Sequence, residues 1–295
     1  MTYIKKEECV YAMDKNNQPV CTVQDGEVVT FETFDCFTNQ ITSEVSSFTT
    51  LDWDRINPAT GPVFIEGAEP GDTLKVEIQK IEIKGNATMV TGTDMGVIED
   101  LLTENTVKIL PVVDDQLIFS DDLKLPLNKM IGVIGVAPKD DPISCGTPDS
   151  HGGNMDCKEI TEGTTLYLPV NVSGALFSLG DCHAAMADGE VSVCGAEVPC
   201  EVTVKLSVIK NKDWPLPFLI RDEKISTLSS KLTVDEACVS ATKMMVSFVE
   251  NYTDLTKGEA IHLLSLAGDL RICQVVDPNK TVRMELPLNY LKNWE

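Results

Sequence analysis

The chain has 295 residues, of which 43% are hydrophobic and 24% are charged, a balance typical of a globular protein. Its formal net charge of −22 disfavours nucleic acids and anionic membranes as partners, because both repel an acidic surface. The sequence contains no apolar run of the roughly 20 residues that span a bilayer, and residues 1–20 lack the apolar core of a signal peptide. We therefore expect a cytoplasmic protein whose ten cysteines remain reduced.

The first two thirds of the chain are predicted to be β-structure. Apolar and polar residues alternate through much of residues 71–83, 164–172 and 200–209, as in strands with one buried face. Residues 129–138 are almost continuously apolar, which indicates a strand buried on both faces. Gly- and Pro-containing turns separate these runs, so residues 1–205 are predicted to form a β-sandwich or barrel-like core.

Residues 206–295 change character and predict a C-terminal α/β region. Thr233 with Glu236, and Thr256 with Glu259, have the spacing of capping boxes, and each pair precedes a helical pattern. Gly268 is placed to end the second helix. Strand patterns return in residues 270–277 and 281–288, so the protein is expected to be mainly β, with two helices packed on strands near its C-terminus.

The chain has only three histidines, and one of them lies in an acidic stretch of small residues, "GDCHAAMADGEVSVCG" (residues 180–195). If this stretch begins as a strand, Asp181 and His183 project from the same face. This nitrogen and oxygen donor set can bind a divalent ion such as zinc, although an Asp–His pair can equally tune a structural hydrogen bond. His262, in the second predicted helix, is expected to be a surface or core histidine.

The position of Glu190 depends on how the chain turns after His183. A two-residue turn at Asp188 and Gly189 would keep Glu190 several residues away along the strand. An open loop would let Glu190 fold back to within reach of Asp181 and His183.

A second polar stretch, "GTPDSHGGNMDCKEI" (residues 146–160), contains His151 and Asp156 as candidate metal ligands. Gly152 and Gly153 permit positive φ and close approach of backbone N–H groups to a ligand. Asn154 could recognise an amide through its own side-chain amide. The alternative interpretation is a turn in which Asn154 takes a left-handed conformation.

Two further acids occupy apolar surroundings. Glu66 directly follows the short strand pattern of residues 63–65, where partial burial would raise the pKa of its carboxyl group and suit proton transfer. Asp35 lies among aromatic residues in "VTFETFDCFTNQI" and is a further candidate metal ligand.

Together these stretches resemble the motifs of the acetamidase/formamidase family. The resemblance runs in order from about residue 25 to residue 280 and includes "ETFDCFTNQI", "NPATGPVFIEGAEPGDTL", "HGGNMDCKEI" and "GALFSLGDCHAAMADGEVSVCGAEV". It implies a cytoplasmic, usually oligomeric hydrolase that converts short aliphatic amides to ammonia and a carboxylate at a metal-dependent site. The motif positions carried over to this chain are Asp35, Glu66, His151, Asn154, Asp156, Asp181, His183 and Glu190. Cysteines at positions 36, 157 and 182 stand beside motif acids where the family pattern does not require them.

We expect the following roles. His183 and Asp181 bind a divalent metal, most simply zinc, with help from Asp35, Asp156 or His151, and calcium is a candidate second ion. Gly152, Gly153 and Asn154 contact the substrate. Glu66 acts as the base and Glu190 supports it or is a further ligand, while the reverse assignment of the two glutamates stays open. The partners expected are a small amide and further copies of the chain, as a homodimer or larger oligomer.

Other chemistries fit the sequence less well. Around Ser178 a leucine replaces the first glycine of the G-x-S-x-G elbow, and the Gly/Ser-rich tract of serine amidases is absent. Cys182 adjoins His183, but consecutive strand residues point to opposite faces, which disfavours a thiol nucleophile. A metal-stabilised β-protein that binds a small ligand without turnover, and a hydrolase of another C–N bond, remain alternatives.

Overall fold

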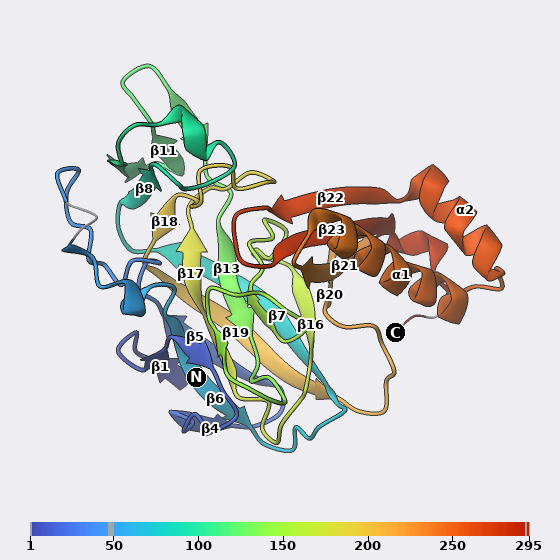
Figure 1. The fold of residues 1–295 in the computed structure, drawn as a ribbon. Helices are drawn as coiled ribbons and strands as arrows, with labels where there is room; N and C mark the ends of the chain where they lie inside the picture. The colour runs from blue at the N-terminus through green and yellow to red at the C-terminus, as the bar shows by residue number, and fades with distance from the viewer. Residues whose placement is uncertain (1, 47–49, 293, 295) are drawn as a thin grey trace.

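The computed structural model describes residues 2–46, 50–292 and 294. Most of the regular structure is β, and the two helices lie near the C-terminus (Figure 1). The first of two large sheets has nine strands in the order β1-β5-β19-β7-β16-β20-β21-β23-β22. These strands are β1 (Thr2–Ile4), β5 (Glu27–Glu32), β19 (Cys200–Ile209), β7 (Thr73–Ile83), β16 (Thr165–Pro169), β20 (Phe218–Arg221), β21 (Lys224–Lys231), β23 (Lys280–Pro287) and β22 (Asp269–Gln274).

The second large sheet carries the motif residues. Its main path has the order β15-β13-β17-β18-β8-β9, and β6 pairs with β17, β2 and β4 beside this path. The strands are β15 (Gly152–Asn154), β13 (Met130–Gly135), β17 (Phe177–His183), β18 (Glu197–Val198), β8 (Ala87–Thr91), β9 (Thr106–Leu110), β6 (Ala59–Ile65), β2 (Cys9–Val10) and β4 (Cys21–Val23). All residues of β13 and β17 are buried, as the continuous apolar run in residues 129–138 predicts for β13.

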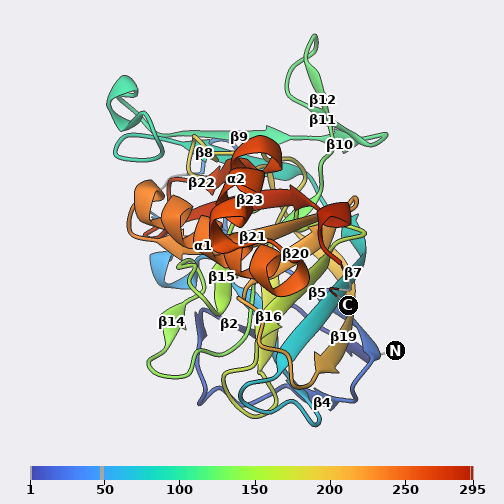
Figure 2. The same cartoon turned by 90° about the vertical axis from the view of Figure 1, so that its right-hand side faces the viewer.

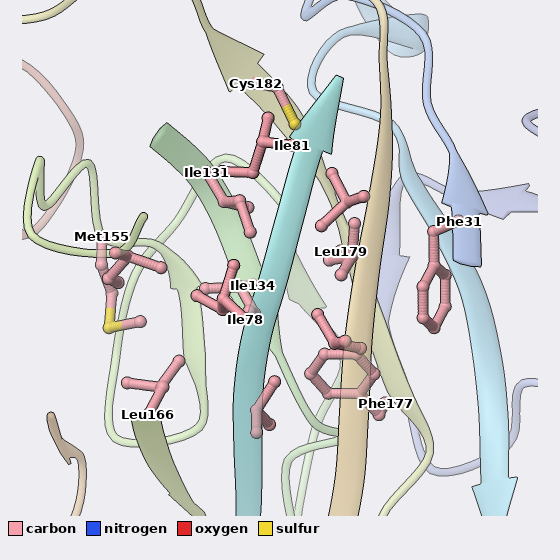
Figure 3. Packing of buried hydrophobic residues seen from close by; sticks show 14 of the residues in the cluster. Phe31, Ile78, Ile81, Ile131, Ile134, Met155, Leu166, Phe177, Leu179 and Cys182 are labelled. Atoms are coloured by element: carbon pink, nitrogen blue, oxygen red, sulfur yellow. The ribbon is translucent and has the colours of Figure 1, made fainter. Parts of the chain in front are cut away.

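The two large sheets share one hydrophobic core. Phe31 and Ile78 from the first sheet and Ile134 and Phe177 from the second belong to the same buried cluster (Figure 3). The rings of Phe31 and Phe177 meet edge to face, with centroids 5.7 Å apart. Over the described residues neither sheet closes into a barrel. The expected fold class, mainly β with a C-terminal α/β part, is confirmed.

The helices α1 (Val234–Tyr252) and α2 (Lys257–Ala267) begin at the predicted capping boxes. The hydroxyl groups of Thr233 and Thr256 accept hydrogen bonds from the backbone N–H groups three residues on, at 3.2 and 3.4 Å. Figure 1 shows both helices gathered at one side of the molecule, where α1 packs on β21 and β23. None of the described helices is long and apolar enough to cross a membrane.

Two small sheets complete the fold. The first consists of β10 (Val112–Val113), β11 (Gln116–Ile118) and β12 (Lys124–Pro126), and with β8 and β9 it forms one end of the molecule (Figure 2). The second pairs β3 (Ala12–Met13) with β14 (Ile143–Ser144). The expected division into residues 1–205 and 206–295 remains a prediction, and β19 runs through that boundary.

Candidate active site at the end of β17

The site is built around His183, the last residue of β17. The ladder between β17 and β18 places Glu197 directly opposite His183. The Nε2 atom of His183 lies 3.1 Å from Oε1 of Glu197 and 3.6 Å from Oδ1 of Asp181. Asp181 has a φ of 50°, so the strand is locally distorted where it presents this carboxylate. Asp181 and His183, which are two residues apart on one strand, therefore both lie close to a third buried group, Glu197.

A second strand brings Asp156 to the same place. Asp156 follows β15, is completely buried, and has Oδ1 3.8 Å from Nε2 of His183. Gly132 of the neighbouring strand β13 leaves the room that these carboxylates occupy. A Cβ atom at position 132 would lie 2.5 Å from Oδ1 of Asp156 and 2.8 Å from Oδ2 of Asp181. The strand can pass this close to two carboxylates only because residue 132 has no side chain.

Glu190 reaches the site on an open loop. The chain does turn at Asp188 and Gly189, where the N–H of Glu190 donates to the carbonyl of Ala187 at 3.2 Å. This turn lies within the loop of residues 184–196 that separates β17 from β18, so it does not join paired strands and does not keep Glu190 away from the site. Glu190 is 6% exposed and one of its carboxylate oxygens lies within 4.8 Å of donor atoms of Asp156 and His183. The open-loop alternative is therefore confirmed.

A buried arginine holds this loop in place. Arg283 of β23 donates from Nη1 and Nη2 to the two carboxylate oxygens of Asp188, at 2.7 and 2.9 Å. Its Nε donates to Glu285 at 2.6 Å. The N–H of Gly189 also donates to the carbonyl of Cys273 at 2.8 Å. A bidentate ion pair fixes the orientation of both side chains. Strands β22 and β23 therefore position Asp188, two residues before Glu190.

A small cavity of about 160 Å³ opens onto these groups. Its polar lining comes from Asn57, Asn154, Asp181, Glu190, Glu197 and Asp277. Its other walls are mainly apolar side chains and two thiols: Cys36, Phe37, Trp53, Ile56, Val90, Met95, Val193 and Cys194. The cavity thus combines several carboxylates with two side-chain amides between largely apolar walls.

Burial and crowding change the protonation of the cluster. Burial raises the pKa of the carboxyl groups of Asp156, Glu190 and Glu197 well above their usual values, and neighbouring carboxylates contribute to each increase. Burial alone would lower the pKa of His183, but the carboxylates of Glu197 and Asp181 raise it well above the ordinary value. So many buried acids around one histidine need shared protons or a bound cation to balance their charge.

The donor set fits a metal ion. Several buried atoms have no hydrogen-bond partner within the part of the chain that the structure describes. Among them are both carboxylate oxygens of Asp156, Oδ1 of Asp181, Oε2 of Glu190, Oε2 of Glu197 and Nδ1 of His183. Two groups have donor atoms within 4.8 Å of one another and could each hold an ion: Asp156, His183 and Glu190, and Cys36, Asp181 and Glu197.

The structure does not bring Glu66 to this cluster. Val63 of β6 pairs with Phe177 and Ala59 pairs with Gly180, so Glu66 lies beyond the opposite end of β17 from His183. Glu66 lies three residues beyond the pair of Val63 and Phe177, and His183 lies six residues on the other side of it, so at about 3.3 Å per residue the separation is roughly 30 Å. Glu66 is exposed and accepts a hydrogen bond from the side chain of Gln24. The expectation that it is partly buried is wrong, and we assign it no part in proton transfer.

Two proposed ligands are buried but lie outside both metal groups of the described chain. The Oδ1 atom of Asp35 accepts the backbone N–H of Asn39 at 2.6 Å, and burial raises the pKa of Asp35 to about 6. Its carboxylate therefore stabilises the turn of residues 35–39. His151 is 1% exposed, and burial lowers its pKa to about 4. We place neither residue among the metal ligands.

The glycine pair serves backbone packing. The N–H of Gly152 donates to the carbonyl of Asp149 at 3.1 Å, so it does not face a substrate. A Cβ atom at Gly153 would lie 2.6 Å from the carbonyl oxygen of Thr147, and Gly153 pairs with Ile134 in the β13–β15 ladder. Asn154, the next residue, does line the cavity, and its buried Oδ1 has no partner within the described residues.

Three site residues were missed from the sequence. Glu197 lies within the last family motif, where the register opposite His183 could have identified it. Cys36 was noted only as a departure beside Asp35. Asp277 follows β22 and reaches the cavity through long-range packing, so no local pattern marks it.

The chain matches the sequence model of the acetamidase/formamidase family over residues 11–145 and 141–293. The chain belongs to the acetamidase/formamidase family. It superposes on an acetamidase from Bacillus halodurans with a TM-score of 0.96 and 47% identity, covering 98% of both chains. An acetamidase from Yersinia enterocolitica gives a TM-score of 0.91 and 29% identity over 97% of this chain and 91% of that one.

A curated relative is less similar to this chain. A Schizosaccharomyces pombe protein that carries a formamidase name is 28% identical, over 64% of this chain. The chain spans 61% of the length of that relative.

Proposed function

We propose that the protein hydrolyses short aliphatic amides of the formamide and acetamide type, giving ammonia and a carboxylate. The observation that carries this proposal is the buried cluster of His183 and carboxylates opening onto a cavity of about 160 Å³. Membership of the acetamidase/formamidase family supports the same reaction class. A cavity of this size suits the amide end of a small substrate, because pockets for drug-sized ligands are typically about 300–1,000 Å³.

We further propose that the cluster binds a divalent metal, with zinc as the main ion. His183 and Asp156 would hold it, together with Asp181, whose Oδ1 lies 3.6 Å from Nε2 of His183. Cys36 and Glu197 form a second group of donor atoms with Asp181. A nitrogen and a thiol among the donors favour zinc, whereas calcium would take an all-oxygen set and remains a candidate second ion. When bound, such an ion brings the pKa of a water molecule to roughly 7 and polarises a carbonyl group.

The side chains of this chain supply the remaining requirements. Glu190 borders the cavity and has an unpaired carboxylate oxygen, so we assign it the transfer of the proton from water to the departing nitrogen. Asn154 can bind the substrate through its side-chain amide. The apolar wall of Phe37, Ile56 and Val90 excludes bulk water and strengthens these polar contacts. Glu190 thus takes the role for which the sequence first suggested Glu66.

The test is an ammonia assay with formamide and acetamide on purified protein. We expect turnover that is lost after dialysis against a chelator and restored by zinc. Ammonia release at an unchanged rate after complete metal removal would contradict the metal proposal. Tight amide binding without ammonia release would indicate a ligand-binding protein, and release only from another class of C–N bond would exclude the proposed substrates.

We also propose a cytoplasmic homodimer or larger oligomer. The end of the molecule formed by β8–β12 and the loops between them exposes several large apolar side chains, among them Val97, Ile98, Leu101, Val113 and Leu123. Clustered apolar exposure of this kind is typical of protein interfaces. Sedimentation of the full chain at micromolar concentration would show a monomer if this proposal fails.

A further inference from the structure

A second, larger cavity of about 400 Å³ lies next to the candidate active site. It lies between the end of the molecule that carries β8–β12 (Figure 2) and the loop of residues 184–196. It is partly open to solvent, since Phe119, Leu125 and Val191 of its lining are 39%, 37% and 62% exposed. The side chains that line it are mostly apolar, including Met89, Leu110, Leu117, Phe119, Leu125 and Met186. Its volume falls within the range of about 300–1,000 Å³ that is usual for small-molecule pockets.

The two cavities border each other at Glu190 and Cys194, which line both. Strand β8 separates them elsewhere, since Met89 faces the larger cavity and its neighbour Val90 faces the smaller one. A molecule whose polar end lies at Glu190 can therefore place an apolar part in the larger cavity.

The polar groups of the larger cavity indicate what such a molecule must offer. Asn128 exchanges two hydrogen bonds with the backbone of Met186, at 2.8 and 2.9 Å. The hydroxyl of Ser192 donates to the carbonyl of Cys194, and Asp188 is held by Arg283. Among the lining residues only Glu190 has a buried side-chain oxygen or nitrogen without a partner in the described chain. The cavity thus fits an apolar body with one hydrogen-bond donor at its end.

We propose that the cavity binds the acyl chain of the amide substrate, so that specificity extends to primary amides with apolar acyl groups of four or more carbons. The inference rests on the proposed function and names its substrate class. The –NH₂ group would donate to Glu190 and the alkyl chain would contact Met89, Leu117 and Leu125. In the reaction, water adds to the carbonyl carbon, the C–N bond breaks, and the products are ammonia and the fatty carboxylate.

The test compares kcat/KM for acetamide, butanamide and hexanamide. Each methylene group moved from water into an apolar cavity contributes about fourfold, so hexanamide should exceed acetamide by at least about tenfold. Leu125 is 37% exposed on β12, and Leu125→Glu would place a charge in the cavity. The variant should lower the hexanamide value by about tenfold and leave the acetamide value within about twofold. Leu270, 46% exposed on β22 and outside both the lining and the end of the molecule that carries β8–β12, gives the matched control Leu270→Glu, which should change neither value.

The possible failures can be told apart. An enzyme that hydrolyses acetamide but prefers it to hexanamide overturns this inference and leaves the proposed function intact. A protein that releases ammonia from none of the amides contradicts the proposed function. In that case, calorimetry measures the binding of both amides to the parent protein and to Leu125→Glu. The inference stands if the parent binds hexanamide more tightly than acetamide and Leu125→Glu does not, and it fails otherwise. If a second copy of the chain fills the cavity instead, Leu125→Glu will dissociate the oligomer without changing the ratio of the two amides, which also overturns the inference.

Discussion

Replacing Gly132 by alanine should disable the site. The new Cβ atom would lie 2.5 Å from Oδ1 of Asp156 and 2.8 Å from Oδ2 of Asp181, whereas ordinary contacts begin near 3.4 Å. Both carboxylates must therefore move by about 1 Å, and misplacing reacting groups by this distance can cost about 10²-fold in rate. Gly132 has no positive φ, so its own conformation suits alanine. The Cβ atom would, however, also lie 2.9 Å from the backbone carbonyl oxygen of Asp181, so β13 must shift slightly against β17.

The assay measures zinc affinity and turnover of acetamide in parallel with thermal unfolding of the metal-free protein. We expect zinc to bind about 10–100-fold more weakly, as is typical when the support of metal ligands is disturbed. Gly85→Ala is the matched control, because a Cβ atom at that position meets only Pro199, at 3.4 Å. Unchanged zinc affinity and turnover in Gly132→Ala would refute the placement of Asp156 and Asp181 in the metal site.

Two further predictions concern buried charge. Arg283→Met removes the buried partner of Asp188 and Glu285, which keep Lys158 at 3.1 Å and Lys224 at 3.5 Å, and should lower the free energy of unfolding by about 1.5–3 kcal/mol, measured by chemical denaturation. A loss below about 1 kcal/mol would contradict the role of this arginine as the clamp of the Glu190 loop. Burial lowers the pKa of folded His151 to about 4, so between pH 6.5 and 4 the unfolded state binds the extra proton and stability falls as the pH falls. Relative to His151→Asn, the free energy of unfolding of the parent protein should fall by up to about 3 kcal/mol over this interval. An equal pH dependence of the two proteins would show that His151 is protonated in the folded state.

Local pattern accounts for much of the fold and for part of the site. The alternation in residues 73–83 and the capping boxes at Thr233 and Thr256 concern contacts between near neighbours in the chain, and the structure contains the corresponding strand and helices. The convergence of Asp181 and His183 follows from their spacing of two along one strand. These features depend on backbone geometry that a short stretch of sequence determines.

The remaining site residues depend on which strands become neighbours. Glu197 reaches His183 through strand pairing, and Asp277 arrives from the far end of the chain. Glu66 follows an apolar strand as the sequence suggests, but that strand emerges at the surface, and the local pattern does not contain this information. Gly132 stands in an unremarkable apolar run, and its importance appears only when Asp156 and Asp181 are packed against it.

The most direct test of the central claim is the turnover number for acetamide in Glu190→Gln beside Glu66→Gln. Each change keeps the size of the side chain and removes a carboxylate that could accept a proton. If the buried cluster at the end of β17 performs the hydrolysis, Glu190→Gln should lose at least about 10²-fold in kcat while its unfolding transition stays intact, and Glu66→Gln should behave as the parent protein. An active Glu190→Gln together with an inactive Glu66→Gln would contradict the account and move the chemistry to the other end of the strand.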